Sequence, residues 1–226
     1  MLWQSIAEHT NAVYAELSKI IDRLDLRERE ALQLAARWHD RGKAHKVFQN
    51  AIKTEENGSP RFDAWVNRRD VAKAPAPWWG RYERKHFRHE LASALAILHP
   101  DSGLRHKDLD LIAYISASHH GKVRISIRSL PGEEKPNGVK RFARGIWDLD
   151  LLPSVDLGGT IAPEVSLSLE LMELGLCEEP PFANQPSWAE RMLRLRDNLG
   201  PFRLAFLETL LRCADERASA HVTPST

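Results

Sequence analysis

Histidine and aspartate side chains, which can bind metal ions, recur along this sequence at positions that its hydrophobic pattern predicts to be buried. The chain has ten histidines, several of them beside acidic residues. His9, His39 and Asp215 each fall on the apolar stripe of a separate predicted helix, and Asp40 adjoins His39. Because a buried carboxylate costs several kcal/mol unless it is paired or neutralised, this placement indicates a cation nearby.

Further histidines extend this set. His89 opens a third predicted helix, and His119 and His120 close a fourth just before Gly121. Imidazole and carboxylate ligands without thiolate suit manganese, iron, cobalt, nickel or zinc better than magnesium. The ligands exceed the needs of one ion, so we expect two ions about 4 Å apart that share Asp40. Any one of these histidines alone would be an ordinary hydrogen-bonded core residue, so the hypothesis depends on the whole set.

The HDRGK segment, residues 39–43, adds a cation beside these groups. We expect Gly42 to let the backbone turn sharply after the helix. Lys43 would then carry a positive charge one helical turn from the ligands, where a phosphate oxygen would lie. The alternative is an exposed lysine at a helix end, favoured there by the helix dipole.

Apolar residues at three- and four-residue spacing predict a mainly helical chain. The predicted helices cover residues 2–20, 29–40, 86–98, 107–119, 166–176 and 187–199, and a last helix follows Gly200 and Pro201. Residues 54–80 hold several prolines and glycines and are predicted to be mostly irregular. The fold class is therefore all-α, a helical bundle.

One segment breaks the helical pattern. Val123, Ile125 and Ile127 alternate with polar residues, which predicts a short strand. We expect a small insertion of β-hairpin and loop over about residues 122–165, and a frayed tail over about 219–226. The length of 226 residues fits a single domain, 1–226.

Composition excludes some classes of protein. No run of 18 apolar residues is present, so no membrane-spanning helix is expected. The N-terminal residues lack a signal-peptide layout, and two cysteines make neither a disulfide framework nor a thiolate zinc site, which together favour a cytoplasmic protein. The net charge of +1 indicates no partner by itself.

The motifs, taken in order, resemble the HD phosphohydrolase superfamily. The closer resemblance is to the HD nuclease domain of the CRISPR-associated helicase-nuclease of type I interference systems. It is carried by His9, HDRGKAHKVFQ (39–49), RHE (88–90), SHHG (118–121) and RCADERAS (212–219). Arg41 departs from the pattern of that family, where an apolar residue is frequent.

The resemblance implies a distribution of ligands between two ions. His9, His39, Asp40 and Asp215 would surround one metal. His89, His119, His120 and the shared Asp40 would hold the second, and Asp40 and Lys43 are the expected catalytic residues. No GxxxxGK[ST] loop occurs in the sequence, so a helicase partner is expected either as a separate subunit or as another domain of a longer protein.

The function expected from these residues is metal-dependent hydrolysis of phosphodiester bonds in single-stranded DNA during CRISPR interference. A metal-activated water would attack phosphorus, and the second ion would stabilise the leaving oxygen. Two alternatives remain open: an HD phosphohydrolase that acts on nucleotides or cyclic dinucleotides, and a non-catalytic, metal-stabilised interaction module.

A basic and aromatic segment just before His89 is the candidate for binding the DNA strand. Aromatic rings interleaved with cations suit stacked bases and a bound backbone. An amphipathic surface anchored by a tryptophan is the alternative. The residues are Trp78, Trp79, Arg81, Tyr82, Arg84, Lys85 and Arg88.

Overall fold

A computed structural model describes residues 3–55, 58, 60–61, 63–75 and 81–220. Its helices are α1 (Ile6–Ile21), α2 (Arg29–Trp38), α3 (Lys46–Ile52), α4 (Asp63–Val66), α5 (His89–Leu98), α6 (Leu109–Ser118), α7 (Trp188–Leu199) and α8 (Pro201–Ala220). Short 3₁₀ turns are η1 (Arg41–Ala44), η2 (Pro100–Ser102) and η3 (Glu170–Met172). The expected all-α bundle with a small β insertion is confirmed, and no described helix is long and apolar enough to cross a membrane.

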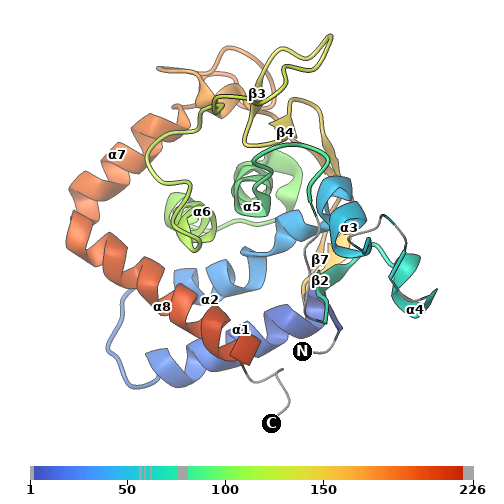
Figure 1. Ribbon diagram of the computed structural model, residues 1–226. Helices are drawn as coiled ribbons and strands as arrows, with labels where there is room; N and C mark the ends of the chain where they lie inside the picture. The colour runs from blue at the N-terminus through green and yellow to red at the C-terminus, as the bar shows by residue number, and fades with distance from the viewer. Residues whose placement is uncertain (1–2, 56–57, 59, 62, 76–80, 221–226) are drawn as a thin grey trace.

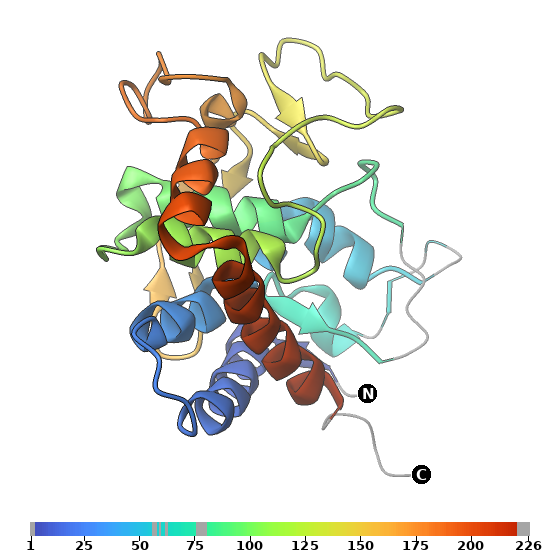
Figure 2. The same cartoon turned by 90° about the vertical axis from the view of Figure 1, so that its left-hand side faces the viewer.

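Helices α5 and α6 pack side by side at the centre of the bundle (Figure 1). Helix α2 packs against α6, and α1 packs against both α2 and α8. Figure 2 shows α7 and α8 following one another along one side of the molecule, with Gly200 between them. Segments from both ends of the sequence, α1 and α8, therefore lie together.

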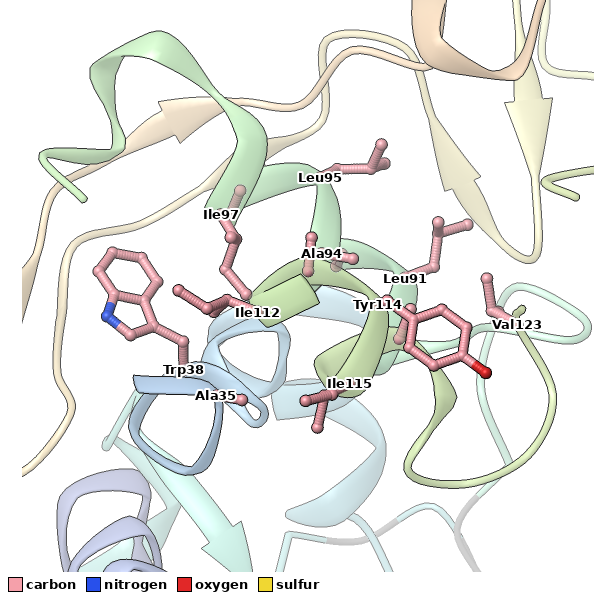
Figure 3. Packing of buried hydrophobic residues seen from close by; sticks show 14 of the residues in the cluster. Ala35, Trp38, Leu91, Ala94, Leu95, Ile97, Ile112, Tyr114, Ile115 and Val123 are labelled. Carbon is pink, nitrogen blue, oxygen red and sulfur yellow. The ribbon is translucent and has the colours of Figure 1, made fainter. Parts of the chain in front are cut away.

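Side chains of α2, α5 and α6 pack against one another in the core (Figure 3). Leu91, Ile112 and Ile115 are fully buried, and the small residues Ala35 and Ala94 allow the helices to approach closely. Every residue of α5 is buried, so this helix is covered on all sides. Its first residue, His89, is thereby held inside the molecule.

Helix α1 begins with a capping box that fixes its first turn. Ser5 accepts a hydrogen bond from the Glu8 backbone N–H, and the Glu8 carboxylate accepts one from the Ser5 backbone N–H. His9 follows on the buried face with Val13 and Leu17. The cap therefore fixes the start of the helix that carries His9.

The expected insertion is present, but its hairpin is not where the alternation of residues 123–127 predicted it. Strands β5 (Leu151–Leu152) and β6 (Val155–Asp156) pair with β8 (Val165–Ser166) and β7 (Ile161–Ala162), respectively, and a small hairpin of β3 (Phe142–Ala143) and β4 (Ile146–Trp147) precedes them. Val123 and Ile127 are buried and Ile125 is exposed, but their segment pairs with no described strand. The Arg124 carbonyl instead accepts from Trp188 Nε1 at 2.7 Å.

The predicted helix over 166–176 is wrong. Leu167 is fully buried and hydrogen-bonds through its backbone to the chain at residues 149–150, so the segment next to β8 is extended. Ser166 belongs to β8, the helical part that the structure describes here is the 3₁₀ turn η3, and Leu174 is 85% exposed. The helix does not form because the backbone of this segment pairs with β5 and with residues 149–150 instead.

Shorter elements lie in the region predicted to be irregular. Within 54–80 the structure has α4 and the strand β2 (Val71–Lys73), which pairs with β1 (Gln4–Ser5). Helix α3 was not predicted, and it is stabilised by Gln49, whose side-chain amide donates to the carbonyls of Lys43 and Val71. The tail predicted to fray from Ser219 is still helical at 219–220, and residues 221–226 lie outside the described part.

Candidate metal centre

The structure brings together all seven side chains that the sequence nominated. His9 comes from the first half of α1, and His39 and Asp40 directly follow α2. His89 opens α5, and Asp215 lies near the end of α8. The remaining pair follows α6: His119 is its C-terminal cap, and His120 is the next residue. Five helices thus converge on one buried point.

Asp40 lies at the middle of this cluster, with its two oxygens facing different histidines. Oδ2 is 3.4 Å from Nε2 of His9 and 3.4 Å from Nε2 of His39. Oδ1 is 3.2 Å from Nε2 of His89. One carboxylate therefore faces two groups of imidazoles, as a bridging ligand would.

Asp215 completes the first group. Its Oδ1 lies 3.0 Å from Nε2 of His9, and candidate ligand atoms of His9, His39 and Asp215 lie within 4.8 Å of one another. Helix α8 supplies this carboxylate from 206 residues further along the chain. The contact between α1 and α8 is what makes the group possible.

The second group consists of imidazoles from α5 and the end of α6. Candidate ligand atoms of His89, His119 and His120 also lie within 4.8 Å of one another. The rings of His119 and His120 are 4.0 Å apart between centroids, and His89 and His119 are 5.7 Å apart. His120 is exposed, unlike the other two, so this group reaches the surface.

Backbone carbonyls orient two of these rings. His39 Nδ1 lies 2.8 Å from the Ala36 carbonyl, and His119 Nδ1 lies 2.6 Å from the Ser116 carbonyl. A carbonyl can only accept, so each Nδ1 carries the proton and each Nε2 keeps its lone pair. These two Nε2 atoms are buried without a hydrogen-bond partner, as are His89 Nε2 and Asp40 Oδ1. This donor set fits a divalent transition metal.

Burial keeps most of these imidazoles neutral. It lowers the pKa of His9 to about 4 and those of His89 and His119 to about 3. Neutral imidazole is the form that binds metal. Burial alone would also lower the pKa of His39, but the negative charge of Asp40 outweighs it and raises this pKa.

Both carboxylates stay ionised. Burial would raise the pKa of Asp40, but His39 and Lys43 hold it well below its usual range. The pKa of Asp215 is likewise lowered against the effect of burial, mainly by His9 and Lys73. The centre therefore combines two negative charges with imidazoles that, apart from His39, burial keeps neutral, which is the electrostatic environment a divalent cation needs.

Gly42 has a different role from the one the sequence indicated. Its backbone does not need a positive φ; instead, a Cβ at this position would lie 2.0 Å from the His89 carbonyl oxygen. The Gly42 N–H donates to Ser93 Oγ at 2.7 Å, and Ser93 Oγ donates to that same carbonyl. Gly42 thus lets the Asp40 turn lie against the start of α5.

The residues nominated for substrate binding differ in their surroundings. Lys43 is buried, with Nζ 2.6 Å from Asp40 Oδ2. Arg84 forms a buried two-point ion pair with Asp150, at 2.5 and 3.0 Å, so its guanidinium is already engaged. Lys85 is exposed and Arg88 partly buried. Half-buried Tyr82 packs against Phe48 and Phe87, and Trp78 and Trp79 lie outside the described residues.

Sequence reasoning missed two charged residues beside the centre. Lys73, on β2, has Nζ 3.9 Å from Asp215 Oδ1. Glu90 Oε2 lies 3.6 Å from His89 Nδ1, and burial raises the pKa of this carboxyl to about 7. The RHE segment pointed to Glu90, whereas no local signal marks Lys73.

An α-helical bundle that gathers an HD doublet, four further histidines and a late aspartate defines an HD-domain hydrolase. The family model described as "Cas3, HD domain" matches residues 1–149, and the chain belongs to this family of HD-type metal-dependent nucleases. A search of curated proteins and a search of solved structures gave no significant match.

Proposed function

We propose that this protein hydrolyses phosphodiester bonds of single-stranded DNA in type I CRISPR interference, with two divalent metal ions as cofactors. His9, His39, Asp40 and Asp215 would hold one ion; Asp40, His89, His119 and His120 would hold the other. The observation that carries the proposal is the position of Asp40, because its two oxygens face the two histidine groups separately. Manganese, iron, cobalt, nickel and zinc suit these ligands better than magnesium.

The chain's own residues prepare the centre for this reaction. When bound, divalent cations lower the pKa of a water molecule and offset the negative charge that develops on the phosphate. The carbonyls of Ala36 and Ser116 hold the imidazoles of His39 and His119 with their lone pairs toward the centre. Lys43 is held by Asp40, so its ammonium group is in place to donate to a phosphate oxygen.

Association with a helicase belongs to the same proposal. The family is that of the Cas3 HD domain, and single-stranded DNA is the product of strand separation. We therefore expect the helicase, as a domain or a subunit, and the CRISPR interference complex to be the partners. A nuclease restricted to single strands would then act only where the helicase has opened the duplex.

Replacement of Asp40 by asparagine tests the proposed function. The substitution keeps the shape of the side chain and removes the charge shared between both histidine groups. With manganese and circular single-stranded DNA, we expect the wild-type protein to cut the circle and Asp40→Asn to be slower by at least about a hundredfold. Asp22→Asn, which alters an exposed ion pair with Arg29 far from the centre, is the matched control and should cut normally.

Two results would contradict the proposal. One is equal cleavage by the wild-type protein and Asp40→Asn. The other is release of phosphate from nucleotides or cyclic dinucleotides while the circular DNA stays intact, which would assign the centre to a nucleotide phosphohydrolase.

A further inference from the structure

A second lysine, outside the HD motif, reaches the metal centre from β2. Lys73 Nζ donates to Ser219 Oγ at 3.1 Å and lies 3.9 Å from Asp215 Oδ1. Ser219 Oγ in turn donates to Asp215 Oδ1 at 3.4 Å. Pairing of β1 with β2 places Lys73 opposite Gln4, next to the start of α1. Two strands and the last turns of α8 thus fix the position of this ammonium group.

Lys73 is not required as the partner of Asp215. That carboxylate already has His9 Nε2 at 3.0 Å, whereas the 3.9 Å to Lys73 exceeds a charged hydrogen bond. A second positive charge, that of Lys43, acts on the same region, and together with burial it lowers the pKa of Lys73. Two ammonium groups at one partly buried site indicate a binding site for an anion that both groups could contact.

The two lysines lie at different depths. The Lys43 side chain is 6% exposed and contacts the central carboxylate Asp40, while the Lys73 side chain is 22% exposed beside Asp215, itself more exposed than Asp40. A phosphate under attack must reach the centre, next to Lys43. Lys73 lies nearer the surface, where the neighbouring part of a polymer would pass.

We propose that Lys73 binds a backbone phosphate next to the scissile one and so makes the centre favour a polynucleotide over a small phosphodiester. This inference rests on the proposed function. A lysine ammonium is a point charge that suits a phosphate oxygen. Ser219, one helical turn after Asp215, directs the ammonium group by its hydrogen bond.

The test compares Lys73→Met with the wild-type protein on a thymidine oligonucleotide and on bis(p-nitrophenyl) phosphate, both with manganese. For the oligonucleotide we expect KM to rise about tenfold with kcat nearly unchanged. The slope of log KM against log salt concentration should fall by about 0.7, the value for one contact with single-stranded nucleic acid. Cleavage of the small diester reports folding and metal loading of the variant, and the ratio of kcat/KM for the oligonucleotide to that for the diester should fall about tenfold.

Two further variants complete the experiment. Lys73→Arg keeps the charge and should keep the salt dependence. Lys19→Met removes a lysine that pairs with Glu16 on α1, about 15 Å along the helix from His9, and should leave KM unchanged. Wild-type KM and salt dependence in Lys73→Met, or equal losses on both substrates, would overturn the inference and leave the proposed function intact. A wild-type protein that cleaves neither substrate would overturn both.

Discussion

At the scale of single residues, the centre depends on histidines of which His9, His89 and His119 stay neutral because they are buried. His39 and His119 have their Nδ1 protons committed to backbone carbonyls, so each presents an unprotonated Nε2 to the centre. Asp40 and Asp215 supply the negative charge. Without a cation this arrangement leaves buried polar atoms without partners, and that is costly. The metal-free protein should therefore be sensitive to acid.

We predict that the metal-free protein loses stability as the pH falls from about 6.5 toward 4. In this range the unfolded chain takes up protons on His9, His89 and His119, whereas the folded chain holds their pKa values at about 3 to 4. The raised pKa values of His39 and Glu90 act in the opposite direction and offset part of the loss. The free energy of unfolding measured in urea should be lower at pH 5 than at pH 7 by on the order of 3 kcal/mol.

Two histidine variants serve as comparisons for this measurement. In His119→Gln the free energy of unfolding should decline less steeply as the pH falls. His86→Gln, at an exposed position, should show the same decline as the wild-type protein. A free energy of unfolding that stays constant or rises between pH 7 and pH 5 would contradict the account.

The seven candidate ligands could be predicted from the sequence. The roles of neighbouring residues such as Lys73 and Arg84 could not. Each of the seven either falls on a buried helical stripe or belongs to a short motif at a helix end, so local pattern identifies it. Lys73 lies on a three-residue strand whose partner, β1, is far away in the sequence. Arg84 was assigned to substrate because its partner Asp150, 66 residues later, has no local signal.

At the scale of elements, the centre depends on how closely the η1 turn approaches α5. We predict that Gly42→Ala destabilises the protein by about 2 kcal/mol and weakens manganese binding, because the new Cβ would overlap the His89 carbonyl and push η1 from α5. Chemical unfolding and metal titration measure the two effects. Gly175→Ala, at a positive φ with open space around it, should cost about 1 kcal/mol and leave metal binding unchanged. Wild-type metal affinity in Gly42→Ala would refute this role.

A buried ion pair attaches the segment before α5 to the β insertion. Arg84 pairs with Asp150 and stacks on Trp147, 3.5 Å from its ring centroid. Burial would raise the pKa of Asp150, but His45 and Arg84 lower it to about 2. Arg41, next to Asp40, donates to the carbonyls of Leu152 and Pro163 in the same insertion. The insertion is therefore tied to the HD motif itself.

We predict that Arg84→Met costs about 3 kcal/mol of stability, because it leaves the buried carboxylate of Asp150 without its main partner. Adding Asp150→Asn should recover part of that loss, and Arg68→Met, which breaks an exposed pair with Asp70, should cost no more than about 1 kcal/mol. Urea unfolding measures all three. If Arg84→Met leaves stability unchanged and makes KM less dependent on salt, Arg84 binds the substrate and the account of this ion pair is contradicted.

The elements could be predicted where their pattern is long and local. Helices α1, α2, α5, α6, α7 and α8 each show a clear apolar period or a glycine or proline at their ends. Helix α3 has seven residues, too few to be stable alone, and it depends on Gln49 contacts with Val71. The hairpin around Gly158 and Gly159 lies inside the expected insertion, but its strands β6 and β7 have two residues each, too few to show an alternating pattern, whereas the alternation at 123–127 forms no described strand.

At the scale of the whole molecule, the first and last helices must meet for the centre to form. His9 on α1 and Asp215 on α8 contact each other although 206 residues separate them. The family match ends at residue 149, yet α8 contributes a carboxylate to the centre. Metal binding should therefore stabilise the fold of the described chain as a unit, since any ligand that binds only the folded state raises its stability.

Anomalous diffraction from manganese-loaded crystals tests the central claim most directly. The account predicts two peaks about 4 Å apart. One should lie among His9, His39, Asp40 and Asp215, and the other among Asp40, His89, His119 and His120. A single peak away from Asp40, or no peak within this cluster at saturating manganese, would contradict it.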